Sequence, residues 1–179
     1  MKKQIILIIT GILLFASGCM SMNTPTSKVE ALLNKYNSND ESIVTELRDY
    51  LSGNELDEET KDKYEKVYLK QFSDLVYEIK EEEIDGDTAE VTAQITVYDY
   101  YKSETESNEY LIEHKEEFYK DDVYDKSLFE EYKLEQLNKT KNRIDYTIEF
   151  TLTKVDDEWQ IDALTDEQLQ KIHGIYAYE

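Results

Sequence analysis

The chain of 179 residues is poor in several residue types, and each shortage limits what the protein can be. Cys19 is the single cysteine, so no disulfide can form within the chain. Pro25 is the single proline and there are five glycines, a composition that argues against a disordered repeat protein. Stability must therefore come from a conventional hydrophobic core, to which 15 tyrosines and one tryptophan can contribute large buried areas.

The motifs that would identify a known class of enzyme are also missing. The sequence contains no serine-hydrolase elbow, no phosphate-binding glycine loop, no pair of zinc-binding histidines and no dinucleotide fingerprint. We therefore expect no cofactor and no bound metal ion. Catalysis is not excluded, but it is a weaker expectation than binding.

Basic residues are scarce relative to acidic ones. The chain carries 41 aspartates and glutamates against 20 lysines and arginines, which gives a formal net charge of −21. A surface of this sign repels nucleic acid and anionic lipid headgroups, so we expect no nucleic-acid partner. The acidity can serve solubility alone, or it can suit a cationic partner.

The longest apolar run covers residues 5–16 (IILIITGILLFA). It is too short to cross the hydrocarbon core of a membrane, which takes about 20 residues of helix. Lys2 and Lys3 precede the run and small residues follow it, which is the organisation of a secretory signal peptide. We therefore predict a signal peptide over residues 1–18.

Residues 14–19 (LFASGC) resemble a bacterial lipobox, in which small residues occupy the three positions before a cysteine. Small side chains leave room for a transferase to reach the thiol of Cys19, and for a peptidase to cut between Gly18 and Cys19. We predict lipid on Cys19 and anchoring at the extracytoplasmic face of the cell membrane, because two acyl chains bind a membrane stably and one does not. The alternatives are an ordinary signal peptide with an incidental cysteine, and an uncleaved anchor.

Removal of residues 1–18 would leave 161 residues, a length suited to one domain. The removed segment holds two lysines and no acidic residue, so the formal net charge would become −23. We expect residues 19–26 to form the lipidated cysteine and a tether, and residues 27–179 to form a single domain.

Helical patterns dominate the first part of this domain. Ser27-x-x-Glu30 has the form of a capping box and predicts that the first helix starts at Ser27. Thr165-x-x-Gln168 predicts the start of the last helix, and Gly174 its end. Apolar residues at helical spacing predict further helices that begin near residues 40, 57, 104 and 126.

Two pairs of strands alternate with these helices. Strict alternation of apolar and polar residues predicts them, with turns at Asp85-Gly86 and at Asp156-Asp157. The order predicts an α+β domain in which N-terminal helices pack on an antiparallel sheet of about four strands, with a helical insertion over residues 103–140 between two hairpins. The predicted strands cover residues 75–84, 89–97, 144–152 and 159–163.

The chain resembles lipoproteins of Gram-positive bacteria that carry a domain of the NTF2-like or cystatin-like type. The resemblance implies a bent sheet wrapped against helices, with a cone-shaped cavity between them. In that superfamily the cavity is an active site, a ligand pocket or neither, so the resemblance does not fix a function. The stretches that carry it are the lipobox, TPTSKVEALLNKY, YEIKEEEIDGDTAEVTAQITVYDYY, IDYTIEFTLTKVDDEWQIDALTDEQL and KIHGIY.

Two histidines are available for acid–base chemistry. His114 falls on the apolar stripe of its predicted helix, where it could act as a general base in a pocket or simply pack. His173 directly precedes Gly174, where a cation at a helix end is favourable. We expect a structural role for both, and name His114 as the one candidate catalytic residue.

Tyrosines and acidic clusters are the remaining candidates for a binding site. Tyr98, Tyr100, Tyr101 and Tyr110 lie around the join between the second strand and the insertion, where they could form an aromatic wall for an apolar or sugar-like ligand, or a core or subunit interface. The acidic clusters could bind calcium, but they lack the spacing of a known calcium loop and are expected to remain solvated. These clusters are Asp85, Asp87 and Glu90, and Asp121, Asp122 and Asp125.

These patterns favour a membrane-anchored module that binds a small ligand or another envelope protein. An enzyme with an NTF2-like cavity, using His114 and an acidic residue, is the alternative. A purely structural accessory domain is the third possibility.

Overall fold

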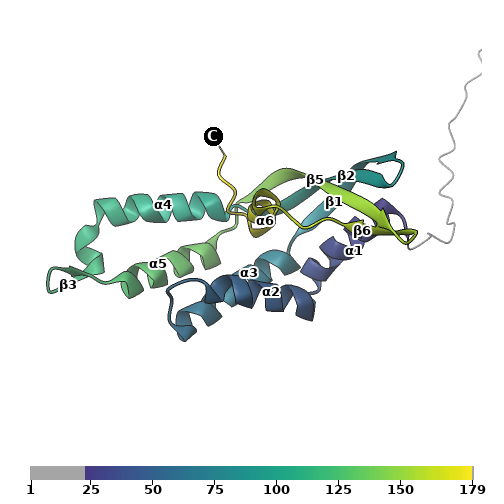
Figure 1. The fold of residues 1–179 in the computed structure, drawn as a ribbon. Coiled ribbons are helices and arrows are strands. Elements are labelled where there is room, and N and C mark those ends of the chain that lie inside the picture. Colours follow the sequence, from purple (N-terminus) through teal and green to yellow (C-terminus); the bar gives the residue numbers. More distant parts are fainter. Residues whose placement is uncertain (1–22, 179) are drawn as a thin grey trace, which may run out of the picture.

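The computed structural model describes residues 23–178, so the predicted signal peptide, its cleavage site and Cys19 lie outside the described residues. Helices and strands alternate as an α+β chain, in agreement with the predicted class (Figure 1). In chain order the elements are α1 (Pro25–Asn37), α2 (Glu41–Ser52), α3 (Glu58–Ser73), β1 (Val76–Asp85), β2 (Thr88–Tyr98), α4 (Tyr100–Glu113), the 3₁₀ helix η1 (Lys115–Phe118), β3 (Tyr119–Lys120), β4 (Val123–Tyr124), α5 (Lys126–Lys139), β5 (Arg143–Val155), β6 (Glu158–Ile161) and α6 (Asp166–His173).

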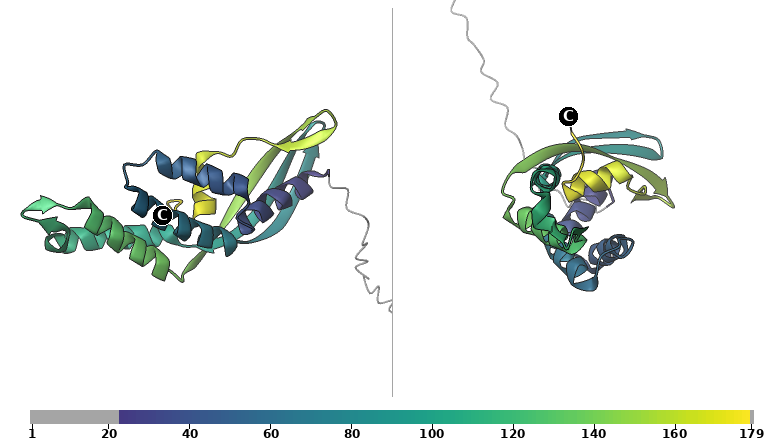
Figure 2. Two further views of the ribbon diagram at one scale, coloured as in Figure 1. Left: turned by 90° about the horizontal axis from the view of Figure 1, so that it is seen from below. Right: turned by 90° about the vertical axis from the view of Figure 1, so that its left-hand side faces the viewer.

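Four of the strands form one antiparallel sheet in the order β1-β2-β5-β6. Two-residue turns join the strands of each hairpin, and positive φ angles at Gly86 (62°), Asp156 (49°) and Asp157 (65°) suit such tight turns. Every second residue of β2 and β5 is buried, so one face of the sheet forms the core and the other faces solvent. The sheet curves over α1, α3 and α6 on its buried side (Figure 2).

The first helix begins earlier than the sequence pattern predicted. Thr24 is its N-cap, and the Thr24 and Ser27 side chains accept hydrogen bonds from each other's backbone N–H at 3.1 and 3.0 Å. The predicted capping box of Ser27 and Glu30 is therefore wrong. Pro25 supplies the reason, because a proline is well suited to the first turn of a helix, where its missing N–H needs no partner.

The insertion between the hairpins also begins earlier than predicted. Asp99 caps α4 by accepting a hydrogen bond from the backbone N–H of Lys102 at 3.0 Å, so the helix starts at Tyr100 and not near residue 104. Helices α4 and α5 form a hairpin that extends away from the sheet, with the short β3–β4 ribbon at its tip (Figure 1). No helix among residues 23–178 has the length and apolar character needed to cross a membrane.

One buried side chain ties the helical layer to the sheet. Gln71 of α3 has no exposed surface, and its Oε1 accepts a hydrogen bond from the backbone N–H of Tyr98 at 2.7 Å. Its Nε2 donates to the carbonyl oxygens of Tyr98 and His173, both at 3.0 Å. Gly174 follows in the left-handed conformation and ends α6 as predicted. The ends of β2 and α6 are thereby fixed to α3, beside the candidate site described next.

Candidate functional site

A polar cleft of about 190 Å³ lies between the α4–α5 hairpin and helices α2 and α3. Phenol groups, carboxylates and lysines line it, which is an unusual concentration of polar groups in a partly buried place. We call it the Glu104 cleft. Its lining residues are Tyr50, Leu51, Asn54, Glu55, Leu56, Tyr64, Tyr68, Glu104, Lys126, Glu130 and Lys133.

The side chain of Glu130 on α5 is buried at the side of this cleft, and one of its carboxylate oxygens has two partners. The hydroxyl of Tyr64 donates to its Oε2 at 2.5 Å, and the ammonium of Lys133 lies 3.0 Å from the same oxygen. Burial first, and then the hydrogen bond to Glu130, raise the pKa of Tyr64 far above its usual value, so this phenol remains protonated. A buried carboxylate with two such partners is a stable structural element.

Glu104 on α4 is the opposite case. Its carboxyl group is partly buried and has no hydrogen bond or ion pair among residues 23–178, and desolvation raises its pKa. The positive charge of Lys133 acts to lower the pKa of Glu104, but this effect is smaller than that of desolvation. Burial is also the main cause that raises the pKa of both Tyr50 and Tyr68, and the negative charge of Glu104 is the second cause. These phenol groups therefore lie near a carboxyl group that has no hydrogen bond or ion pair within residues 23–178.

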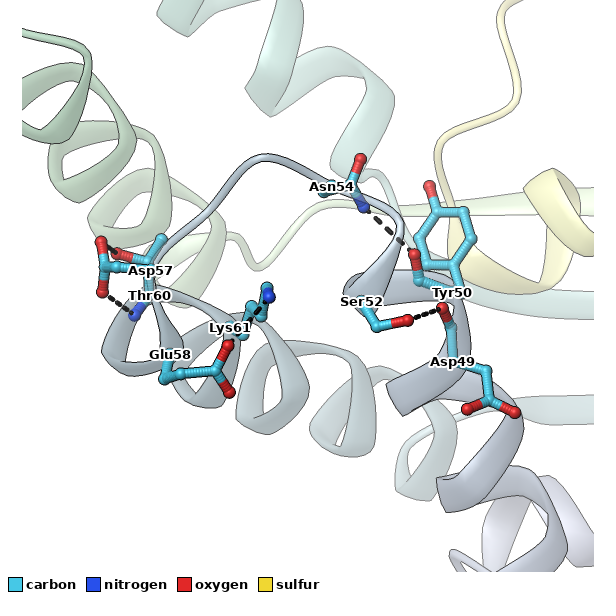
Figure 3. A network of polar contacts seen from close by, with 8 residues as sticks. All are labelled: Asp49, Tyr50, Ser52, Asn54, Asp57, Glu58, Thr60 and Lys61. Atoms are coloured by element: carbon cyan, nitrogen blue, oxygen red, sulfur yellow. Dashed lines mark hydrogen bonds and ion pairs between the residues drawn. The ribbon is translucent and has the colours of Figure 1, made fainter.

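The loop between α2 and α3 forms the outer wall of the cleft and is held by its own hydrogen bonds. Asp57 caps α3 by accepting from the backbone N–H and the hydroxyl of Thr60 at 2.9 and 2.8 Å. Asn54 donates to the carbonyl oxygen of Tyr50 at 3.3 Å. Figure 3 shows Tyr50 projecting from the last turn of α2 beside this loop. Tyr50 therefore lies between the end of α2 and this loop, where its side chain lines the cleft.

A second, mostly apolar pocket of about 240 Å³ adjoins the cleft, and Tyr50 lines both. His173 is part of its wall and packs against the rings of Tyr50, Tyr68 and Phe72, with centroid distances of 5.5, 5.1 and 5.5 Å. Burial lowers the pKa of His173 to about 4, so its ring is neutral at pH 7. The expectation of a cation at the end of α6 is therefore wrong, because desolvation outweighs the favourable helix end. The pocket is lined by Tyr36, Ile43, Glu46, Leu47, Tyr50, Phe72, Leu169 and His173.

His114, the candidate catalytic residue, lies at the end of α4 and not in the Glu104 cleft. Its ring stacks on Tyr110 with a centroid distance of 3.9 Å, and its Nδ1 is 3.2 Å from the carbonyl oxygen of Tyr110. The contacts of residues 23–178 include no carboxylate hydrogen-bonded to this ring. The structure thus places His114 in the packing of the hairpin tip, and its catalytic role stays a prediction.

The four tyrosines considered as one aromatic wall lie in separate places. Tyr98 and Tyr100 stack on each other with a centroid distance of 5.9 Å, and Tyr100 is buried. Tyr101 packs against Tyr178 at 5.1 Å. Tyr110 lies toward the tip of the α4–α5 hairpin, stacked on a tyrosine of α5. None of them lines the Glu104 cleft, because their spacing follows the course of the chain and not a shared face.

The acidic clusters serve as turns and caps. Asp121 and Asp122 form the β3–β4 turn with positive φ angles. Asp125 caps α5 and pairs with Lys120 at 2.8 Å. Asp85 ends β1 at the other turn. Within the part of the chain that the structure describes, no group of three or more histidine, cysteine or acidic side chains could hold a metal ion.

Comparison with known proteins gives little further guidance. No protein-family model matches the chain, and no curated protein matches it. Among solved structures, the crystal structure of ycdA from Bacillus subtilis, a predicted lipoprotein, is 19% identical with a TM-score of 0.44. The match covers 84% of this chain, which spans 47% of the length of that protein. A likeness of this extent does not establish a shared fold or function.

Proposed function

We propose that the protein is a lipoprotein anchored at the extracytoplasmic face of the cell membrane, and that its domain binds a small ligand in the Glu104 cleft. The binding role is supported above all by Glu104, a partly buried carboxyl group in the cleft with no hydrogen bond or ion pair among residues 23–178. Such a group costs folding free energy, and groups of this kind concentrate at functional sites. Kinship with NTF2-like or cystatin-like domains is also part of the proposal. The Glu104 cleft is lined by helices and by the loop between α2 and α3, so it differs from the cavity between sheet and helices that the resemblance implies.

The start of the described chain supports an orientation for the anchored domain. Asn23 donates to the carbonyl oxygen of Asp157 at 2.8 Å and accepts from the backbone N–H of Trp159 at 3.0 Å, so it is fixed to the β5–β6 turn. Three residues lie between Cys19 and Asn23, so the Cα atoms of these two residues can be about 14 Å apart at most. Lipid on Cys19 would therefore hold the β5–β6 end close to the membrane. The α4–α5 hairpin, at the opposite end in Figure 1, would point away from it.

Anchoring is tested by the Cys19→Ala variant. We expect wild-type protein to incorporate a radioactive fatty acid and to fractionate with membranes. Cys19→Ala should incorporate none and should accumulate as an unprocessed precursor, because the thiol is the only acceptor. Ser21→Ala, two residues further along the same segment, is the matched control and should behave as wild type. Mass spectrometry of an unmodified Cys19 with residues 1–18 still attached would contradict the proposal.

Ligand binding is tested on the mature lipoprotein in detergent micelles. Thermal unfolding is followed against a panel of amines, amino acids, sugars and organic acids. A ligand of the cleft should raise the unfolding temperature of wild type, and less so that of Tyr68→Phe, which keeps the ring and loses the hydroxyl. A panel in which no compound shifts the wild-type transition would argue against a small-ligand function.

A further inference from the structure

The Glu104 cleft and the apolar pocket adjoin at Tyr50, and we treat them as the polar half and the apolar half of one site. Tyr50 lines both, it is 49% exposed, and it lies at the end of α2, whose preceding turns contribute Ile43 and Leu47 to the apolar half. No other residue is shared between the two linings. A ligand that fills both halves would pass beside the ring of Tyr50. Such a ligand must be polar at one end and apolar at the other.

The polar half selects a positive charge. Glu130 is already paired with Tyr64 and Lys133, and Lys126 donates to the backbone carbonyl of Glu55 at 3.0 Å. The carboxylate of Glu104 has no ion pair among residues 23–178. The acidic side chains that line the cleft (Glu55, Glu104 and Glu130) also outnumber the basic ones (Lys126 and Lys133), so an anion placed at Glu104 would be repelled. An ammonium or guanidinium group would instead form a charge-assisted hydrogen bond with this carboxylate and lie near aromatic rings.

The apolar half suits a hydrocarbon group. Its walls come from four helices and are formed mainly by aliphatic and aromatic side chains, and the one histidine among them is neutral. Among the residues that the structure describes, Glu46 is the only acidic one in this lining, and no lysine or arginine belongs to it. Apolar groups gain free energy when they leave water for such a pocket, about a fourfold gain in affinity for each methylene buried.

We propose that the two halves together bind an amphiphilic cation, with its ammonium or guanidinium group at Glu104 and its apolar group in the pocket between Ile43, Phe72 and Leu169. This inference rests on the proposed ligand-binding function and names its ligand class. The formal net charge of −21 would also raise the local concentration of cations around the domain.

The test uses compounds that share a hydrocarbon chain and differ in charge. Butylammonium, butanol and butyrate are titrated into the mature lipoprotein in micelles by calorimetry at pH 7, with empty micelles as the blank. We expect butylammonium to bind at least tenfold more tightly than the other two. Glu104→Gln should remove this preference. Glu109→Gln, an exposed carboxylate on the same helix, should retain it.

A second series tests the apolar half. Ethyl-, butyl- and hexylammonium should bind with affinities that rise by up to fourfold for each methylene until the pocket is full. Glu104→Gln should unfold at a temperature no lower than wild type, because the neutral amide avoids the cost of burying a charge. A lost preference in a folded variant therefore reports on the site and not on folding.

The outcomes separate the ligand class from the function on which it rests. Amine binding that Glu104→Gln leaves unchanged, or tighter binding of butanol or butyrate, would overturn the cationic class while ligand binding stands. Affinity independent of chain length would overturn the apolar half. Absence of binding both in these series and in the wider panel would overturn the proposed function itself.

Discussion

Gln71→Leu is expected to be among the most destabilising single substitutions in this domain. Leucine approximates the volume of glutamine but cannot hydrogen-bond. The change would leave three backbone groups without their hydrogen-bond partner. These groups are the N–H and carbonyl of Tyr98 and the carbonyl of His173. The hydrogen bonds to these groups join α3 to the ends of β2 and α6, so the substitution removes a connection between the helices and the sheet.

The magnitude follows from the burial of these groups. A buried backbone group left without a partner costs about 1–3 kcal/mol. Tyr98 is partly exposed, so water can replace part of the hydrogen bonding that its backbone groups lose, whereas His173 is buried. The leucine side chain has no amide group, so the cost of burying that group disappears and offsets about 1 kcal/mol of the loss. We therefore expect a loss of about 3 kcal/mol, a large fraction of the 5–15 kcal/mol that is typical of a folded domain.

Urea unfolding followed by far-UV circular dichroism measures this loss. The midpoint should fall with the slope unchanged, since the surface exposed on unfolding is the same. Gln170→Leu makes the same chemical change at an exposed site on α6 and should alter the free energy of unfolding by less than about 0.5 kcal/mol. A loss below about 1 kcal/mol for Gln71→Leu would refute the reasoning that these three bonds fix the helical layer to the sheet.

Two further predictions concern the same end of α6. Gly174→Ala should destabilise the protein by about 3 kcal/mol or more in the same assay. The φ angle of Gly174 is 74°, and a Cβ there would lie 2.2 Å from both Gln71 Nε2 and the carbonyl oxygen of Tyr98. Gly53→Ala is the control and should cost little, because its Cβ would meet nothing closer than 3.6 Å. His173 should make stability depend on pH. Its pKa falls from 6.5 in the unfolded chain to about 4 in the folded one, so the unfolded state binds the proton more readily between these values. This contribution to the free energy of unfolding is complete above pH 6.5 and is lost as the pH falls, by about 2 kcal/mol at pH 5. The His173→Leu variant should lack this pH dependence. If the stability of both proteins depended equally on pH, the buried, neutral ring would be contradicted.

The acidic cleft and the neutral histidine illustrate a limit of sequence patterns. Glu104 stands in a run of polar residues on α4, and nothing in that run distinguishes it from Glu106 or Glu109. Its importance arises because α3 and α5 bring phenols and a second carboxylate around it. Desolvation is a property of the assembled environment, so neither the burial of Glu104 nor the lowered pKa of His173 could be predicted from neighbouring residues.

The sequence by itself determined the fold class and the order of the six α-helices and of the four strands of the main sheet, but it did not predict η1 or the β3–β4 ribbon. Alternation in residues 89–97 and 144–152 is a local signal, and it predicted the paired strands and their buried faces. Thr165, Gln168 and Gly174 likewise predicted the bounds of α6, because caps involve residues only a few positions apart. Cys19 and the run before it predicted the membrane anchor from local chemistry as well, which the described residues do not test.

Only the tertiary structure decided which side chains meet. The four tyrosines from 98 to 110 are neighbours along the chain but lie in separate clusters, whereas Tyr50, Tyr68 and Glu104 come from three helices and share one cleft. The physical reason is that caps and periodicity act over a few residues, while a binding site is formed by packing between elements far apart in sequence.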